Sequence, residues 1–264
     1  MSPPPSFLAL LAVIFPDQSW RISLLPLIKD EPLQAEPTQA EPLRAGVPLA
    51  AMPLAGVPLA ATDFLRPDEV RKWQSFASDK RGREWLAGRL CTYGCAWQLA
   101  GPWPKEKDFS ARNWWLANAD DGRPFWQGNV PEDLRGTNIS LSHGGGYALA
   151  ALARLPVGVD VQPCQAKVEK VAAQFATDEE EKTLVQLMPA DERLARLTLL
   201  WSAKETLRKA APDLPAFLAM HLVDGRRQNE GWWLTFTCQG KTGETTVAAT
   251  MHDGHAFAFC LLEE

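Results

Sequence analysis

The chain has 264 residues, of which 46% are hydrophobic and 22% are charged. This composition is typical of a globular protein that buries a sizeable core as one large domain or two small ones. Its net charge of −5 and its pI near 5.5 argue against a general nucleic-acid-binding protein, because neutralising phosphates requires a basic surplus. The five cysteines form no C-x-x-C pair and have no histidine at metal-ligand spacing, so we expect reduced thiols in a cytosolic protein.

Residues 1–62 differ in composition from the rest of the chain. Residues 7–15 form an apolar run with no preceding Lys or Arg, too short to span a bilayer and unlike a secretory signal; a first strand or a poorly ordered leader explains it better. Between residues 34 and 61 two short segments each occur twice, and prolines recur at positions 48, 53 and 58, which excludes a helix or a central strand. We therefore predict a mobile Pro/Ala-rich leader without chemistry.

Regular structure is predicted from residue 63 onward. Residues 67–98 have the periodicity of a helix with a break near residues 78–82. Arg83 and Arg89 lie off the apolar face of the second piece, where solvated arginines are the plain alternative to a functional role. A Trp-rich irregular segment follows, and the sequence Asp-Asp-Gly-Arg-Pro at residues 120–124 is typical of a turn.

Three strands are predicted next, at residues 137–142, 147–153 and 157–162. Their short connections, one of them containing three consecutive glycines, favour antiparallel pairing of all three as a meander. Ser142 and His143 would then lie one hairpin away from Asp160, near the exit of the third strand. A permissive glycine turn and an ordinary strand end remain the simpler alternatives.

Two helices follow, and the second carries the stretch around which the chain is organised. A capping box at residues 177–180 opens the first, which ends near residue 189, and the second is expected over residues 191–211. Within it Trp201, Glu205 and Lys209 are spaced i, i+4 and share one stripe. Asp160 supplies a second carboxylate from another element, and Mg²⁺ usually binds one or two carboxylates together with substrate phosphates. A core Trp beside a helix salt bridge is the alternative.

Basic residues concentrate on this second helix, which suits an anionic ligand or an acidic partner as well as a solvated helix face. They are Arg193, Arg196, Lys204, Arg208 and Lys209. Three strands, at residues 232–239, 245–252 and 255–262, close the chain. Helices and antiparallel strands occur in two successive blocks, so we predict an α+β fold with two similar halves, residues 63–154 and 155–264.

Four motifs occur in order along the chain: Gly122-Arg-Pro124, Asn138-Ile-Ser-Leu-Ser-His143, Gly158-Val-Asp160 and Trp201-x-x-Lys-Glu-x-x-x-Lys209. In this order they resemble the Sfp-type 4′-phosphopantetheinyl transferases, and residues 83–90 are similar to the bacterial AcpT-like branch. The resemblance covers about residues 66–212. It implies a pseudo-twofold α+β fold with coenzyme A at the junction of the two halves.

The resemblance also implies a reaction and a set of site residues. The enzyme would be a holo-[acyl-carrier-protein] synthase, moving the 4′-phosphopantetheine arm of coenzyme A to a serine of an apo acyl or peptidyl carrier protein and leaving adenosine 3′,5′-bisphosphate. Glu205 and Lys209 match the catalytic residues, and Asp160 and Glu205 match the Mg²⁺ ligands. The expected coenzyme A contacts are Arg83, Arg89, Arg123, Ser142, His143 and Lys204.

One position departs from the family pattern. Many members carry a third acid two residues after the aspartate, where this chain has Gln162, an amide that can still ligate Mg²⁺ or hold a metal-bound water without adding charge. The expected partner is an acidic carrier protein, with neither nucleic acid nor a membrane bound, and we expect a monomer. The alternative is a non-catalytic carrier-protein or nucleotide-binding module, which would have no need for Asp160, Glu205 and Lys209 together.

Overall fold

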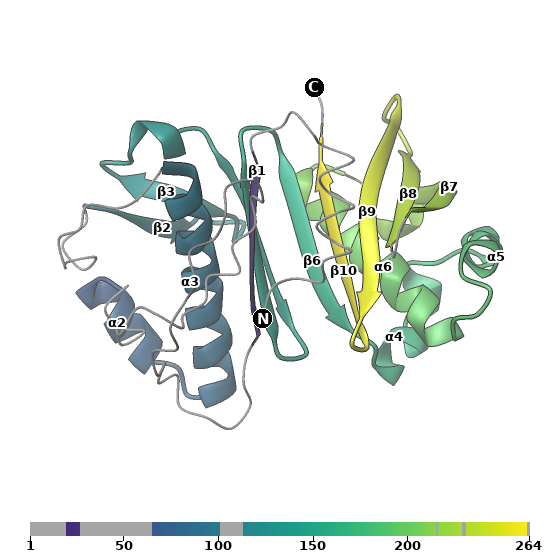
Figure 1. Ribbon diagram of the computed structural model, residues 1–264, viewed down its shortest axis with the longest axis horizontal. Helices are drawn as coiled ribbons and strands as arrows, with labels where there is room; N and C mark the ends of the chain where they lie inside the picture. Colours follow the sequence, from purple (N-terminus) through teal and green to yellow (C-terminus); the bar gives the residue numbers. More distant parts are fainter. Residues whose placement is uncertain (1–19, 27–64, 101–112, 215, 229–230, 263–264) are drawn as a thin grey trace, which may run out of the picture. The chain divides into compact units, whose positions relative to one another are not determined.

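The computed structural model describes residues 20–26, 65–100, 113–214, 216–228 and 231–262 (Figure 1). Within these ranges the chain forms two compact units: residues 20–26, 65–141 and 146–154 belong to the first, and residues 142–145 and 155–262 to the second. Both units combine helices with antiparallel strands, so the predicted α+β class is confirmed. The apolar run and the Pro/Ala repeat lie outside the described residues.

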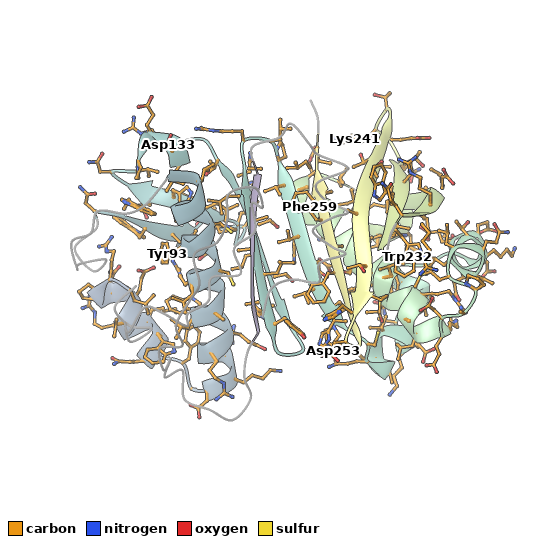
Figure 2. The ribbon with its side chains drawn as sticks, viewed as in Figure 1. Tyr93, Asp133, Trp232, Lys241, Asp253 and Phe259 are labelled. Atoms are coloured by element: carbon orange, nitrogen blue, oxygen red, sulfur yellow. The ribbon has the colours of Figure 1, made fainter. Side chains whose placement is uncertain are left out.

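The first unit packs a long helix on a small sheet. The sheet has the order β1-β5-β4 and consists of Trp20–Pro26, Tyr147–Ala153 and Asn138–Gly144. The helix α3 (Asp79–Ala100) packs on β5 and β1, and α2 (Pro67–Gln74) precedes it, so the two-piece helix was predicted correctly. A hairpin of β2 (Trp114–Asn118) and β3 (Pro124–Gly128) adds two tryptophans to the core, where Tyr93 of α3 lies 6.1 Å from the Trp114 ring and 6.0 Å from the Trp126 ring (Figure 2).

The second unit is a five-stranded antiparallel sheet covered by α6 (Arg193–Ala210). The strand order is β6-β10-β9-β8-β7, and α6 packs on β6, β10 and β9, while α5 (Asp178–Leu187) packs against β7 (Figure 1). The strands are Val157–Pro163, His255–Leu261, Glu244–His252, Gly231–Cys238 and Met220–Gln228 in that order. Shorter elements complete the fold: α4 (Ala166–Lys170) and single 3₁₀ turns at Glu132–Leu134, Ala172–Gln174 and Phe217–Ala219. The capping box is confirmed, since Thr177 and Glu180 bond each other's backbone N–H.

The predicted three-strand meander was wrong in its last member. The strand β6 belongs to a different sheet from β4 and β5; it pairs with β10, with Asp160 opposite Ala258. The free edge of β5 is taken by β1, with Ile22 opposite Ala151. Short connections favour pairing with the sequence neighbour, but strands far along the chain compete for the same edge, and the sequence does not rank them.

Four strands were missed, each for a recognisable reason. The strand β1 lies within the stretch that the sequence assigned to a leader, because seven residues beside a Pro-rich repeat give a weak signal. The strand β7 is an edge strand with a bulge between Leu222 and Asp224, and one polar, exposed side conceals its pattern. The hairpin of β2 and β3 was hidden in a segment where tryptophans dominate both faces.

Two further properties of the described residues bear on function. None of the helices has the length and apolarity that a membrane span requires. All five cysteines are free thiols, as predicted. Burial raises the pKa of the Cys260 thiol to about 12, and it also raises the pKa of the half-exposed Cys164, so neither thiol is activated as a nucleophile.

Candidate active site

A glycine in β6 allows α6 to lie directly on the strand. A Cβ at Gly158 would stand 1.9 Å from the carbonyl oxygen of Thr206 and 3.2 Å from Cβ of Ala210, so no side chain fits between strand and helix. Side chains alternate along a strand, which puts Asp160 on the same helix-facing side as Gly158. The close contact therefore brings Asp160 to the stretch of α6 that carries Glu205 and Lys209.

Asp160 is buried, and its two carboxylate oxygens have different surroundings. Oδ1 accepts hydrogen bonds from Ser142 Oγ at 2.7 Å and from Lys209 Nζ at 2.7 Å. Lys209 also donates to the carbonyl of Val159 at 3.1 Å, which fixes its ammonium group beside the carboxylate. Oδ2 is buried and has no hydrogen-bond partner among the described residues. An unsatisfied buried carboxylate oxygen costs free energy unless a cation or water binds it.

Glu205 is half-buried on α6 and interacts electrostatically with Asp160. Its pKa is raised, first by burial and then by the Asp160 carboxylate, while Lys209 and Arg208 lower it. Two neighbouring carboxylates are also suited to share a divalent cation. No group of three or more His, Cys, Asp or Glu side chains in the described ranges is arranged as a metal site, so the ligand set here rests on two acids.

These donors fit a hard divalent cation. The bare Asp160 Oδ2 and the Glu205 carboxylate supply oxygen ligands of the kind Mg²⁺ prefers. Gln162 lies two residues beyond Asp160 on the same face of β6 and is half-buried, so its amide is placed on the correct side of the strand. His143 is exposed at the end of β4. Of the residues singled out from sequence, four thus lie together at β6 and α6: Ser142, Asp160, Glu205 and Lys209.

Comparison with known proteins agrees with this geometry. Residues 156–260, which include β6 and α6, match the 4′-phosphopantetheinyl transferase superfamily. The chain is also similar to enterobactin synthase component D of Salmonella austin, with 32% identity over 144 residues that make up 53% of each protein. It therefore spans about half the length of this curated relative.

Lys204 is not the coenzyme A contact that the resemblance implied. Its side chain is fully buried, and Nζ donates to the carbonyls of Phe175 at 2.7 Å and Phe217 at 3.0 Å and pairs with Glu180 at 2.7 Å. These three acceptors satisfy all three ammonium donors. Lys204 instead anchors α6 to α5 and β7, because Glu180 also accepts from the backbone N–H of Leu222. Lys204 and its neighbour Glu205 have different roles because they differ in burial, which the sequence does not give.

Ser142 also has a different role from the one expected. Its hydroxyl is buried, donates to Asp160 and accepts from the backbone N–H of Val161 at 3.2 Å. Both interactions stay within the protein, so the hydroxyl orients the carboxylate of Asp160 and is not directed at a phosphate. The sequence drew attention to Ser142 but did not give the partner of its hydroxyl.

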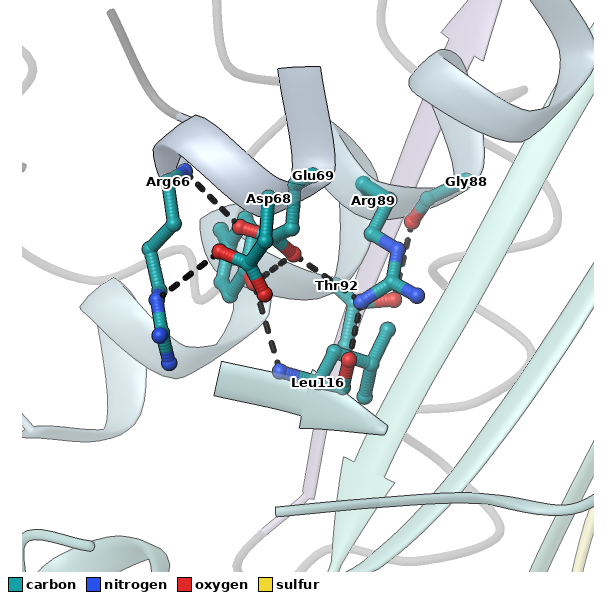
Figure 3. Close-up of polar contacts among 8 residues, drawn as sticks. Arg66, Asp68, Glu69, Gly88, Arg89, Thr92 and Leu116 are labelled. Atoms are coloured by element: carbon teal, nitrogen blue, oxygen red, sulfur yellow. Dashed lines mark hydrogen bonds and ion pairs between the residues drawn. The ribbon is translucent and has the colours of Figure 1, made fainter. Parts of the chain in front are cut away.

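Arg89, in the first unit, belongs to a buried network. Its Nη1 donates to Glu69 Oε1 at 3.0 Å and to the Leu116 carbonyl, and Tyr93 donates to the same Glu69 oxygen at 2.7 Å (Figure 3). The guanidinium also stacks 4.6 Å from the Trp85 ring. This network joins α2, α3 and β2, so the coenzyme A contact expected of Arg89 is replaced by a structural role.

The other two arginines of the first unit that were expected to contact coenzyme A are at least partly accessible. Arg83 is half-buried on α3. Arg123 ends the turn between β2 and β3, is 61% exposed and pairs with Asp121 at 2.6 Å. Hydrogen bonds from the backbone N–H of Arg123 and then from its guanidinium lower the pKa of the Asp121 carboxyl. Exposed ion pairs of this kind contribute little to stability, so Arg123 is free to exchange its partner for a phosphate. Both arginines remain predictions as coenzyme A contacts.

Sequence reasoning missed two features of the second unit. Gly158 was quoted as part of a motif, but its role as the contact point of α6 was not seen; a lone Gly within a β-branched strand is a signal of close backbone approach. Glu180 was recognised as a capping residue and not as the counter-ion of Lys204. Nothing in the sequence connects residues 180 and 204.

Proposed function

We propose that this protein transfers the 4′-phosphopantetheine arm of coenzyme A to a serine hydroxyl of an apo acyl or peptidyl carrier protein. The observation that supports this most directly is the cluster of Asp160, Glu205 and Lys209 on β6 and α6, within the residues that match the superfamily. A binding module without catalysis is the alternative, and it gives no reason to bury an unsatisfied carboxylate oxygen beside a second acid.

The reaction breaks one P–O bond and forms another. The serine oxygen attacks the phosphorus that bears the pantetheine arm, adenosine 3′,5′-bisphosphate leaves with the bridging oxygen, and the serine proton is transferred to a base. Glu205 is suited to take this proton because burial and Asp160 raise its pKa. The ammonium group of Lys209 lies 2.7 Å from Asp160, and the side chain is 28% exposed. The ammonium can therefore contact a pyrophosphate oxygen as negative charge develops there.

Asp160 and Glu205 would hold Mg²⁺, with Gln162 on the same face of β6. Bound there, Mg²⁺ neutralises pyrophosphate charge and stabilises the leaving phosphate. Ser142 keeps one oxygen of Asp160 occupied, which leaves the other for the ion. We further propose that the protein acts as a monomer in the cytosol, where its five thiols stay reduced, and that His143, Arg83 and Arg123 contact coenzyme A.

Intact-mass measurement tests this proposal. The protein is incubated with coenzyme A, Mg²⁺ and a panel of apo carrier proteins from fatty-acid, polyketide and peptide synthesis, and a carrier should gain the mass of one phosphopantetheine arm. Glu205→Gln should abolish the gain, while Glu179→Gln, an exposed acid on α5, should not. Coenzyme A binding without any mass gain across the panel would favour the binding module.

A further inference from the structure

The glycine turn after His143 is a packed junction and not a free loop. A Cβ at Gly144 would lie 2.9 Å from the carbonyl oxygen of Val161, and a Cβ at Gly145 would lie 2.0 Å from Nε2 of His255 and 2.8 Å from Cβ of Pro163. Gly145 also has φ of +59°, in the left-handed region that favours glycine. The turn is therefore fixed against the end of β6 and against one side chain of β10.

That side chain, His255, contacts the turn through its ring. Nε2 lies 3.0 Å from the carbonyl oxygen of Gly145, and Nδ1 lies 2.6 Å from the carbonyl oxygen of Asp253. A carbonyl oxygen only accepts hydrogen bonds, so Nε2 donates to Gly145 in the Nε2–H tautomer of the ring and in its protonated form, in which Nδ1 also donates to Asp253. The contact joins residues 110 positions apart and connects the β9–β10 hairpin to the turn that follows Ser142 and His143.

A tight turn at Asp253 and Gly254 precedes His255 in the β9–β10 hairpin. Asp253 and Gly254 have φ of +47° and +67°, which matches the two-residue turn that Asp-Gly sequences favour between antiparallel strands. This turn is at the end of β9 and β10 marked by Asp253 in Figure 2. The carbonyl of Gly254 accepts from the backbone N–H of Cys164 at 2.8 Å, so the hairpin is also tied to the residues following β6.

We infer that His255 is a positioning residue for the phosphate-binding end of the active site. By holding the Gly145 carbonyl it fixes the peptide groups that follow His143, the residue we expect to contact coenzyme A. The inference rests on the proposed function, because it assigns His255 to the binding of that substrate. His255 acts through the turn, so its loss affects substrate binding more than the transfer step.

Steady-state kinetics of three variants test the inference. His255→Ala should raise KM for coenzyme A about 3- to 10-fold, the equivalent of about one hydrogen bond, with kcat and KM for the carrier nearly unchanged. His255→Gln, whose amide N–H can still donate to Gly145, should recover part of this loss. His252→Ala is the matched control, because His252 is the exposed cross-strand partner of His255, and it should behave as wild type.

Calorimetric titration with coenzyme A, without a carrier protein, gives a readout independent of transfer. His255→Ala should bind it more weakly than His252→Ala at equal melting temperature. Equal affinities in these two variants would overturn the role of His255, as would a kcat loss as large as the change in KM. Wild-type protein that binds coenzyme A but modifies no carrier would overturn the proposed function instead, and the two failures are thereby distinguished.

Discussion

The buried ion pair of Lys204 and Glu180 should produce a large stability loss when one partner is removed. Lys204→Met keeps the length and apolar character of the side chain but removes the ammonium group. Glu180 is then an unpaired carboxylate whose side chain is only 2% exposed. Breaking one partner of a buried pair costs about 3–5 kcal/mol, which lowers the melting temperature by on the order of 10 °C in a protein of this size.

Chemical and thermal unfolding of four variants, each compared with wild type, measure this effect. Glu180→Gln should be milder than Lys204→Met, because burial lowers the pKa of Lys204 and the unpaired amine can lose its proton. The double variant removes both charges, so its free energy of unfolding should exceed the additive expectation by about 1–3 kcal/mol. Lys241→Met is the control, since Lys241 pairs with Asp213 at the same 2.7 Å but on the surface, and its cost should be below about 1 kcal/mol.

Two results would refute the reasoning. A loss no greater in Lys204→Met than in Lys241→Met would show that burial adds nothing to this pair. Additive losses in the double variant would show that Lys204 and Glu180 contribute through separate contacts, such as the carbonyl of Phe175 and the N–H of Leu222.

Three further changes test the site. Burial and Asp160 raise the pKa of Glu205, so the folded protein keeps that proton to a higher pH than the unfolded chain, and stability falls as pH rises above about 4.5. With a chelator present, Glu205→Gln should therefore have a higher melting temperature than wild type at neutral pH but not below pH 4.5. Added Mg²⁺ should raise the melting temperature of wild type more than that of Glu205→Gln. Identical melting curves for the two proteins would contradict this reasoning. Gly158→Ala should cost about 1–3 kcal/mol or more through the contact with Thr206 and reduce transfer, whereas Gly82→Ala, with 3.4 Å of space, should be nearly neutral. Gln162→Glu should lower the Mg²⁺ concentration at half-maximal rate and leave the limiting rate similar; an unchanged Mg²⁺ requirement removes residue 162 from the metal site.

The sequence predicted the local elements of the site better than their partners. Periodicity and capping located β6, α5 and α6 to within a few residues, because these signals depend on neighbours in the chain. The pairing of β6 with β10 depends on a strand about a hundred residues away, and local pattern does not specify such a choice. Asp160 and Glu205 were placed together by resemblance, not by periodicity.

Misassigned side chains share one cause. Lys204, Arg89 and Ser142 are polar residues next to or within motifs, and from sequence each was expected to face a ligand. The structure buries all three and gives each an internal partner: Glu180, Glu69 and Asp160. Whether a charged residue faces solvent or a buried counter-ion is decided by packing between distant elements, so the sequence alone does not separate Lys204 from Glu205.

The unequal oxygens of Asp160 bear on which cation the proposed metal site would select. One oxygen already accepts from Ser142 and Lys209, so the side chain offers an incoming ion its other oxygen alone. Calcium collects six to eight oxygen ligands and often takes both oxygens of one carboxylate, whereas magnesium accepts single oxygens and keeps much of its own water. In the proposed site, a serine hydroxyl and a lysine ammonium, neither of which needs to touch the ion, would thereby favour the smaller cation.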